Sequence, residues 1–242
     1  MKLWVNVCFH YVENRLSDFN QVIKTLNQID GVKIIVNSNK NFDDNLNIHV
    51  AENLADPFHL TWEHKKYMQS FLQSHYTHFA YIEGNILFGK RQMDYWLKTK
   101  DLFERNNMNF IPALHRIEKD FENEIYSLDC TRTINTFSKL IVEGQEFVSI
   151  PEPYQGMFVM DKDMVEEHIN SDYFNLGQKH NYGIRESANL GNMYINVPPT
   201  FSHRMMTPLQ DFSDTFVHHI TNNYINNPHS PHAKIKVENL FV

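Results

Sequence analysis

The sequence predicts an α/β fold in which a mixed, mostly parallel sheet is flanked by helices. The chain has 242 residues, of which 42% are hydrophobic and 13% aromatic. This composition is typical of a globular protein with a large core. Residues 3–39 also show the order strand, helix, strand, which favours parallel strands joined by crossover helices.

The opening of the chain shows this alternation most clearly. Residues 3–9 form a short apolar, β-branched and aromatic run that predicts a strand. Residues 16–29 place apolar side chains at helical spacing, and we expect Ser17 or Asp18 to cap this helix. Residues 32–39 predict a second strand that ends in polar turn residues.

The later elements follow the same two patterns. We expect further strands at 47–54, 78–88 and 109–118, and helices at 61–74, 93–106 and 183–195. Pro112 places the strand at 109–118 at a sheet edge or a bend. Residues 119–150 predict a short antiparallel excursion, residues 156–169 a strand followed by a helix, and residues 196–203 an extended segment.

The composition limits the domain count and the class of ligand. The chain has 8 Gly and 9 Pro without a long linker, so we expect one domain. The formal net charge is −7, and Lys65-Lys66 is the densest basic cluster. Long nucleic acid is therefore an unsuitable partner. A polyanionic small molecule would have to be bound by local groups, such as a metal or single basic residues.

The expected location is cytoplasmic. Cys8 and Cys130 are the two cysteines, and they form no C-x-x-C motif or disulfide framework. This usage fits a reducing compartment. The sequence has no apolar stretch of transmembrane length, and its first residues lack the pattern of a signal peptide.

In the stretch HFAYIEGNILF (78–88), an apolar run stops at Glu83-Gly84-Asn85 and then resumes. Polar groups at a strand end can bind a ligand at the rim of a sheet, and oxygen ligands can hold a divalent cation. The alternative is an ordinary turn, because Gly and Asn tolerate positive φ. Taken by themselves, Glu83, Gly84 and Asn85 favour the interpretation as an ordinary turn.

Other polar residues also allow two readings. Glu186, near an expected helix start, is either a general base or an acid that favours the helix dipole. Lys65 is either a phosphate ligand or part of a solvated helix face. Gly156, after Tyr154 and Gln155, either lets a substrate approach the backbone or forms a turn.

The histidines and the absent motifs limit the possible metal ligands and the possible enzyme classes. Of 14 histidines, His203 and the adjacent pair His218-His219 are the candidates for a metal or a phosphate. Neighbours on a strand face opposite ways, so the pair cannot act jointly. The sequence contains no G-x-G-x-x-G after its first strand, no P-loop and no G-x-S-x-G, which disfavours common dinucleotide enzymes, P-loop ATPases and serine hydrolases.

The collinear order of several segments resembles a GT-A-type glycosyltransferase over most of the chain. The segments are VNVCFHYVENRLSDFNQVIKTL, KIIVNSN, LTWEHKKYM, YIEGNILF, YQGMFVMDKDMV, GIRESANLG and VHHITNNYINNP. In such enzymes the strand end matched by YIEGNILF carries a D-x-D-like motif that holds a divalent metal against the diphosphate of a sugar nucleotide. The resemblance implies a single GT-A-like domain with a Rossmann-like nucleotide-sugar-binding half at 1–118 and an acceptor-binding half at 119–242.

The resemblance also implies a function and site residues. It implies an inverting transfer from a nucleotide-diphosphate sugar to a glycan or glycoconjugate, as in polysaccharide biosynthesis, with Mn²⁺ or Mg²⁺ as cofactor and Glu186 as catalytic base. The metal ligands would be Glu83, Asn85 and His218, and acceptor binding would fall to Tyr154, Gln155, Gly156 and Arg185. The nucleotide sugar would contact His10, Glu13, Arg15, Asn37, Lys65, Glu83 and Asn85.

The sequence departs from the family pattern at the metal-binding turn. Where such families often have Glu-Asp-Asp or Asp-x-Asp, this chain has Glu83-Gly84-Asn85, which retains one carboxylate. Metal affinity should fall with ligand charge. The metal would then bind weakly and need the nucleotide, or catalysis would be metal-independent, or activity would be lost.

Two rival functions come from other classes. The first is a degenerate GT-A domain that binds a sugar nucleotide or a glycan without turnover, as the missing acid suggests. The second is a metal-dependent hydrolase that uses the His and Asp content, against which the poor ligand spacing counts.

Overall fold

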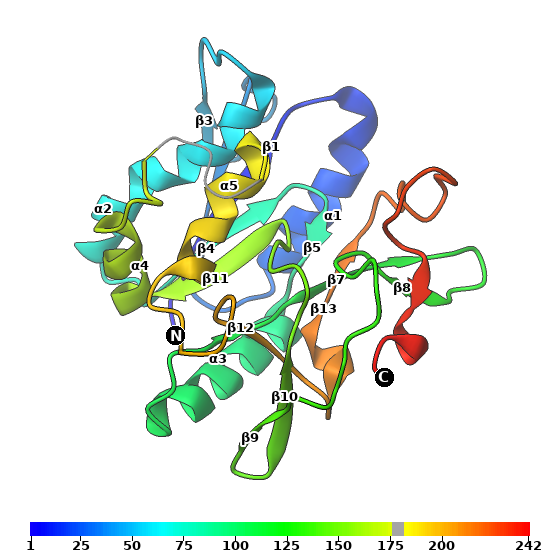
Figure 1. Cartoon of the computed structure of the whole chain (residues 1–242). Coiled ribbons are helices and arrows are strands. Elements are labelled where there is room, and N and C mark those ends of the chain that lie inside the picture. The colour runs from blue at the N-terminus through cyan, green and yellow to red at the C-terminus, as the bar shows by residue number, and fades with distance from the viewer. Residues whose placement is uncertain (176–181) are drawn as a thin grey trace. The chain divides into compact units, whose positions relative to one another are not determined.

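The computed structural model describes residues 1–175 and 182–242, and the predicted α/β fold class is confirmed (Figure 1). The chain forms two compact units. The first comprises residues 1–86 and 156–195, and the second residues 87–155 and 196–242. The expected single domain, with a functional division at residue 118, stays a prediction.

The first unit is built on a five-stranded mixed sheet. Its strand order is β11-β4-β1-β2-β3, in which β1, β2, β3 and β4 are parallel and β11 is antiparallel to β4. The order β3-β2-β1-β4 matches one half of the doubly wound fold. The strands are β1 (Leu3–Phe9), β2 (Val32–Ser38), β3 (Ile48–Val50), β4 (His78–Glu83) and β11 (Met157–Asp161).

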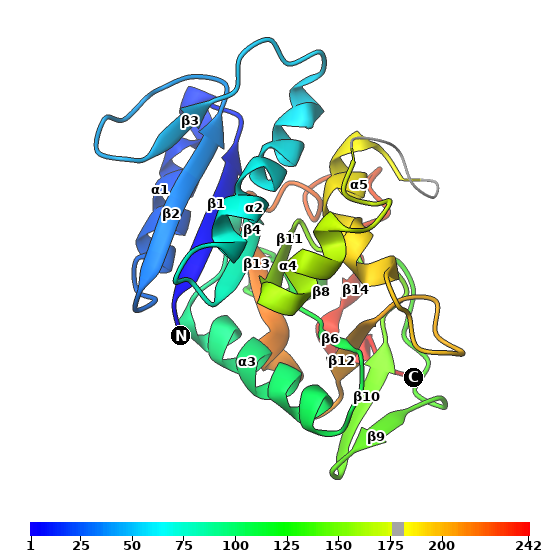
Figure 2. The same ribbon diagram turned by 90° about the vertical axis from the view of Figure 1, so that its left-hand side faces the viewer.

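Alternate side chains of β1 cover the two faces of this sheet. Phe9 stacks on Phe19 of α1 (Leu16–Leu26), with ring centroids 4.3 Å apart. Trp4 has the opposite parity and meets Phe71 of α2 (Met68–Leu72), edge to face at 6.5 Å. Because neighbouring residues of a strand point to opposite faces, α1 and α2 pack on opposite sides of the sheet (Figure 2).

Two helix starts differ from the sequence-based expectation. A 3₁₀ turn, η1 (Glu13–Arg15), precedes α1 and makes Arg15 its N-cap, so the cap predicted at Ser17 or Asp18 is wrong. The helix expected at 61–74 starts earlier, as the 3₁₀ helix η2 (Pro57–Tyr67), and becomes α-helical only in α2. Residues 60–65 are all buried, and an element buried on every side lacks the single apolar face by which sequence patterns reveal helices.

The other helices of the first unit lie where the sequence places them. The strand and helix expected at 156–169 are β11 and α4 (Lys162–Ile169), and Asp161 caps α4 by accepting a bond from the Met164 amide at 2.8 Å. The helix expected at 183–195 is α5 (Ile184–Leu190), which continues as the 3₁₀ helix η3 (Gly191–Tyr194).

The second unit contains two sheets and the long helix α3 (Lys90–Arg105). One sheet has the order β6-β12-β10-β9, with Pro112 on its edge strand β6 (Ile111–Pro112), as predicted. The other has the order β14-β8-β7-β13-β5, and β5 (Ile86–Leu87) lies where the chain passes into this unit. The remaining strands are β7 (His115–Lys119), β8 (Ile125–Ser127), β9 (Leu140–Val142), β10 (Gln145–Ser149), β12 (Met205–Pro208), β13 (Phe216–His219) and β14 (Ile235–Lys236).

Pairing in the second unit confirms the antiparallel excursion expected within 119–150. β8 is antiparallel to β7, and β9 is antiparallel to β10. α3 packs on the β6-β12-β10-β9 sheet through an apolar cluster that includes Phe103, Phe147 and Met206. Two 3₁₀ helices complete the unit, η4 (Phe212–Thr215) and η5 (Val237–Asn239). No helix of the described residues has the length and apolar character needed to cross a membrane.

Candidate functional site

The strand order of the first unit singles out one edge of its sheet. From β1, the chain continues on one side to β2 and β3, and on the other side lies β4. In open α/β sheets, ligands bind outside the carboxyl ends of the strands where the order reverses in this way. Here those ends are Cys8-Phe9 of β1 and Glu83 of β4, and Cys8 is the register partner of Glu83.

The turn after β4 is held tightly against the end of β1. The Gly84 amide donates to the Cys8 carbonyl at 2.8 Å, and the Glu83 amide donates to the Gly156 carbonyl at 3.0 Å. A Cβ at Gly84 would lie 2.9 Å from Cδ2 of Phe9. Gly84 is not at positive φ. Glycine is therefore required here for close approach between chain segments, which neither the turn reading nor the ligand reading anticipated.

Arg185 brings two predicted site residues together. Its Nη2 and Nε atoms donate to Oε1 of Glu186 at 2.9 and 3.1 Å. Its Nε also lies 4.0 Å from Oε1 of Glu83. The Glu83 side chain is 14% exposed and those of Glu186 and Arg185 are 27% and 34% exposed, so all three remain accessible from solvent. The expected base and the expected diphosphate or metal ligand thus share one guanidinium.

The start of α5 is fixed from η2. The indole Nε1 of Trp62 donates to the Ile184 carbonyl at 2.9 Å, directly before Arg185. Glu186 lies in the first turn of α5, and a Cβ at Gly183 would be 2.7 Å from its Oε2. Gly183 therefore leaves the space that the Glu186 carboxylate occupies.

Lys65 is buried and does not lie on a solvated helix face. Only 7% of the residue is exposed, and its Nζ donates to the carbonyls of Tyr173 and Phe174 at 2.7 and 3.1 Å. The ammonium also lies 4.0 Å from the centre of the Trp62 ring. Burial lowers the pKa of Lys65 to about 7. In this structure Lys65 ties η2 to the segment after α4, and its contact with a diphosphate stays a prediction.

A cavity of about 510 Å³ opens at the carboxyl ends of β1, β2 and β3. It is lined by His10, Asn39, Ala51, Glu52, Asn53, Leu54 and Pro57. These residues follow directly after the three strands or begin η2. Asn39 accepts a bond from the Tyr11 amide at 2.6 Å and so shapes the loop after β1. The volume lies within the range of small-molecule sites.

The residues expected to contact the nucleotide sugar are only partly gathered at this cavity. His10 lines it, and Glu13 and Arg15 are exposed in η1. Asn37 is fully buried in β2, with its Nδ2 3.5 Å from Oδ1 of Asn6.

The sequence analysis missed three polar residues of the cavity, Asn39, Glu52 and Asn53. The signal that could have found them is their position just after predicted parallel strands, whose carboxyl ends share one edge of a sheet.

The residues expected to bind the acceptor fall in both units. Tyr154 and Gln155 are 9% and 2% exposed in the second unit. Oε1 of Gln155 accepts a bond from the Leu114 amide at 2.9 Å, and the Arg116 guanidinium lies 4.7 Å from the centre of the Tyr154 ring. Gly156 has φ +63°, a conformation that favours glycine, so the turn reading accounts for it. Acceptor binding by these residues stays a prediction.

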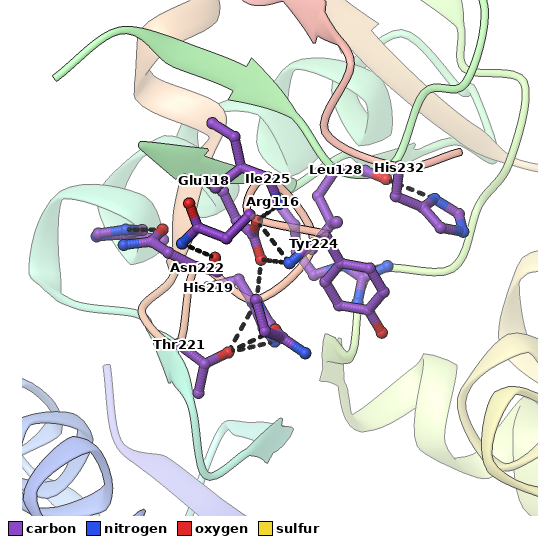
Figure 3. A network of polar contacts seen from close by, with 12 residues as sticks. Arg116, Glu118, Leu128, His219, Thr221, Asn222, Tyr224, Ile225 and His232 are labelled. Atoms are coloured by element: carbon purple, nitrogen blue, oxygen red, sulfur yellow. Dashed lines mark hydrogen bonds and ion pairs between the residues drawn. The ribbon is translucent and has the colours of Figure 1, made fainter. Parts of the chain in front are cut away.

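The two adjacent histidines of β13 have separate partners, both in the second unit. Nε2 of His218 is 3.1 Å from Oδ1 of Asn222, and burial lowers the pKa of His218. His219 lies within 2.7 Å of the fully buried Glu118, which also accepts the backbone amides of Tyr224 and Ile225 at 3.1 and 2.6 Å (Figure 3). This network, centred on an acid that sequence reasoning did not select, orders the loop after β13.

The donor set at Glu83 fits a divalent cation poorly. It offers one carboxylate, which faces Arg185, and the amide oxygen of Asn85, which is buried. Within residues 1–175 and 182–242, no three His, Cys, Asp or Glu side chains are grouped so that they could hold a metal. A metal with Glu83, Asn85 and His218 as ligands stays a prediction, since these residues belong to different units.

The cysteines are not activated nucleophiles. Burial, followed by the charge of Glu83, raises the pKa of the half-buried Cys8 to about 12. Burial and the neighbouring Asp129 raise the pKa of Cys130 to about 12 as well. Both are free thiols, and both remain protonated at neutral pH.

No protein-family model and no curated protein matches this sequence. Solved structures that are similar to it at low identity include the following three. CMP:2-keto-3-deoxy-manno-octonic acid synthetase, complexed with CTP, has 11% identity and a TM-score of 0.40, over 74% of this chain and 80% of that one. Residues 1–349 of S. aureus TarS have 10% identity and a TM-score of 0.39, over 80% of this chain and 54% of that one, so this chain spans about half of that structure.

The third is a putative glucose-1-phosphate thymidylyltransferase from Bacillus anthracis in complex with a sucrose. It has 10% identity and a TM-score of 0.36, over 69% of this chain and 75% of that one. The α/β architecture of this chain is established by its own strand order.

Proposed function

We propose that this chain is a glycosyltransferase that moves a sugar from a nucleotide-diphosphate sugar to a glycan or glycoconjugate acceptor. One observation carries the proposal: Arg185 joins Glu83 and Glu186 at the carboxyl edge of the sheet, beside the reversal in strand order. Acids and a guanidinium at such an edge suit a ligand that carries a diphosphate and a reacting sugar.

The cavity next to this cluster has room for the nucleoside. His10, on its wall, directly follows Phe9, against which Gly84 packs. Pro57, also on its wall, precedes Phe58, whose ring centre lies 5.7 Å from the Arg185 guanidinium. A nucleoside in the cavity would therefore place its diphosphate toward Arg185.

Arg185 is the group that we assign to the leaving diphosphate. A guanidinium donates in a planar fork that matches phosphate oxygens, and it remains charged at all relevant pH values. It offsets the negative charge that develops as the sugar–phosphate bond breaks. The resemblance to glycosyltransferases implies that Arg185 binds the acceptor. Its contact with Glu83 supports a second role for Arg185, in binding the donor.

Glu186 is the proposed general base of a single displacement. Its carboxylate takes the proton of an acceptor hydroxyl while that oxygen forms a bond to the anomeric carbon, and the nucleoside diphosphate leaves from the opposite face. The anomeric configuration is therefore inverted. Because Arg185 holds Oε1 of Glu186 in this structure, a shift of Arg185 to the diphosphate would release the base, and the donor would bind first.

No step of the proposed reaction uses a metal, because the oxygen ligands at Glu83 and Asn85 fit a divalent cation poorly. A requirement for Mn²⁺ or Mg²⁺ is tested together with donor binding. The chain is titrated with a panel of nucleoside diphosphates, with and without Mn²⁺, and its thermal shift is recorded. A ligand at about 100 times its dissociation constant stabilises by roughly 2.7 kcal/mol.

The outcomes of this titration separate the cases. If one nucleotide raises the unfolding temperature without Mn²⁺, the result supports Arg185 as the group that balances the charge of the diphosphate. If the rise requires Mn²⁺, the result supports a bound metal in that role. The absence of a shift with every nucleotide would contradict the proposed function.

A second candidate is a domain that binds the sugar nucleotide without turnover. The observation that favours it is the direct ion pair between Arg185 and Glu186, which occupies the proposed base. It predicts nucleotide binding without release of nucleoside diphosphate on any acceptor. Transfer of sugar to an acceptor excludes it.

A further inference from the structure

The second unit contains a cavity of about 540 Å³, and none of its lining residues belongs to the site proposed above. Its walls come from the β7–β8 turn, the start of β8, η4, β13, β14 and η5. The volume lies within the range of small-molecule sites. A ligand in this cavity would contact residues of the second unit.

One side of the cavity is aromatic. The ring of Phe212 meets that of Phe216 edge to face at 4.9 Å, and that of Phe241 at 4.8 Å and 75°. Phe212 is 9% exposed, and Phe216 and Phe241 are half-buried. The two half-buried rings therefore offer a fixed apolar surface to a ligand.

The rim of the cavity is polar and slightly acidic. Nζ of Lys236 lies 3.2 Å from Oε2 of Glu124, and Glu238, Asn123 and Ser213 are exposed beside them. Two carboxylates and one ammonium leave an excess negative charge, which repels phosphate groups. The rim nevertheless offers several hydrogen-bond donors and acceptors.

We propose that this cavity binds a neutral saccharide unit. A pyranose ring has an apolar C–H face that can lie on the Phe216 and Phe241 rings, and hydroxyl groups at its edge that can bond to the rim. The excess negative charge disfavours a nucleotide sugar. In the proposed glycosyltransferase this is a binding site for the glycan acceptor, and that assignment of role rests on the proposed function.

The β7–β8 turn provides a second aromatic group near this rim in sequence. Phe121 is 93% exposed, and the turn that carries it also supplies Asn123 and Glu124 to the cavity. Singly exposed apolar side chains are common on protein surfaces, so Phe121 by itself does not indicate a ligand.

Saccharide binding can be measured on the full chain without any donor. Saturation-transfer-difference NMR is recorded with maltose, cellobiose, lactose and N,N′-diacetylchitobiose at millimolar concentration, and with UDP present at a saturating level as a competitor. We expect saturation transfer to at least one disaccharide, with the strongest signals on the C–H protons of one ring face. UDP should not displace it.

Two variants locate the binding site. Phe241→Leu keeps an apolar side chain but removes the ring, and Glu238→Gln removes one rim charge from an exposed position where it cannot prevent folding. We expect Phe241→Leu to weaken binding roughly two- to tenfold, the usual effect of losing one aromatic contact. Phe137→Leu is the matched control, because Phe137 is 92% exposed and does not line the cavity.

The outcomes decide this proposal independently of catalysis. Binding that weakens in Phe241→Leu or Glu238→Gln but not in Phe137→Leu supports it, whether or not the chain shows turnover. No transfer to any disaccharide, or unchanged binding in both cavity variants, would overturn it. If the chain transfers sugar but fails these tests, the proposed function stands and the proposed saccharide site is wrong.

Discussion

The guanidinium of Arg185 donates to a single carboxylate oxygen of Glu186 from two nitrogens, at 2.9 and 3.1 Å. The two residues are neighbours in the first turn of α5, and the carbonyl of Ile184, its first residue, accepts a bond from Trp62. In the proposed reaction this contact keeps the base occupied until a diphosphate attracts the guanidinium. The pair therefore links donor binding to the readiness of the base.

Replacing Glu186 with Gln should remove most turnover while leaving donor binding intact. The amide keeps the shape of the side chain but cannot take a proton, and loss of a general base costs roughly 10²–10⁴-fold in rate. The measurement is the release of nucleoside diphosphate in the presence of acceptor. Glu166→Gln is the control, because Glu166 is an exposed acid on α4. Unchanged turnover in Glu186→Gln would exclude the base role.

Replacing Arg185 with Ala should weaken donor binding by about tenfold to a hundredfold, the usual effect of losing hydrogen bonds to a charged group. Calorimetric titration with nucleoside diphosphate measures this, first without and then with Mn²⁺. Arg185→Lys should recover only part of the affinity, because an ammonium lacks the planar fork. Arg132→Ala, at an exposed position, should bind as the wild type does. Equal affinity in wild type and Arg185→Ala would contradict the diphosphate role.

The parts of the fold that depend on local pattern could be predicted from sequence. The alternation of strand and helix at 3–39 shows in the sequence as changing apolar patterns, and the short apolar runs of β4 and β11 show as buried strands. The sequence predicts a helix from residue 61, but the earlier start of η2 at Pro57 could not be predicted, because its buried residues include Glu63, His64 and Lys65 and so show no apolar face. The adjacency of Arg185 and Glu186 is visible in sequence, but the contact between Arg185 and Glu83 is not.

The unpredicted parts of the sites depend on contacts between distant segments. The carbonyls that accept from Lys65 lie 108 and 109 residues further along the chain, so the sequence shows a helix-surface lysine where the structure has a buried tie. Glu118 stands in an ordinary strand, and its donors come from a loop more than 100 residues away. The cavity beside β1 likewise requires the loops after three strands to meet.

Two glycines should respond differently to replacement by Ala. A Cβ at Gly84 meets the ring and Cβ of Phe9 at 2.9 and 3.1 Å and the Cys8 carbonyl at 3.2 Å, so something in the packed sheet must move. We expect Gly84→Ala to lower the free energy of unfolding by about 1–3 kcal/mol, the usual cost of overpacking. A Cβ at Gly183 meets only the Glu186 carboxylate, which can turn away.

Gly183→Ala should therefore reduce turnover more than stability, because it displaces the proposed base. Urea denaturation and steady-state rates are measured on both variants. Wild-type turnover in a stable Gly183→Ala protein would show that the position of the Glu186 carboxylate does not matter for the reaction.

Lys65 should make stability depend on pH. Burial lowers its pKa from the usual 10.5 to about 7, so above about pH 7 the folded state holds fewer protons than the unfolded state. Stability then rises with pH between about 7 and 10.5, by up to about 1.4 kcal/mol per pH unit from this group alone. The difference in unfolding free energy between wild type and Lys65→Met isolates the effect. A difference that is flat across this range would mean that the carbonyls of Tyr173 and Phe174 and the Trp62 ring keep the ammonium charged.

Glu118→Gln should destabilise the second unit strongly. The buried carboxylate accepts from Nδ1 of His219 and from the amides of Tyr224 and Ile225, whereas glutamine has one accepting oxygen and an amide group that donates. Breaking a buried pair in this way costs about 3–5 kcal/mol. The neighbouring His218→Gln removes only a half-buried bond to Asn222 and should cost about 1 kcal/mol. Thermal and urea unfolding of both variants test this, and a smaller loss in Glu118→Gln than in His218→Gln would show that the loop after β13 does not depend on the Glu118 carboxylate.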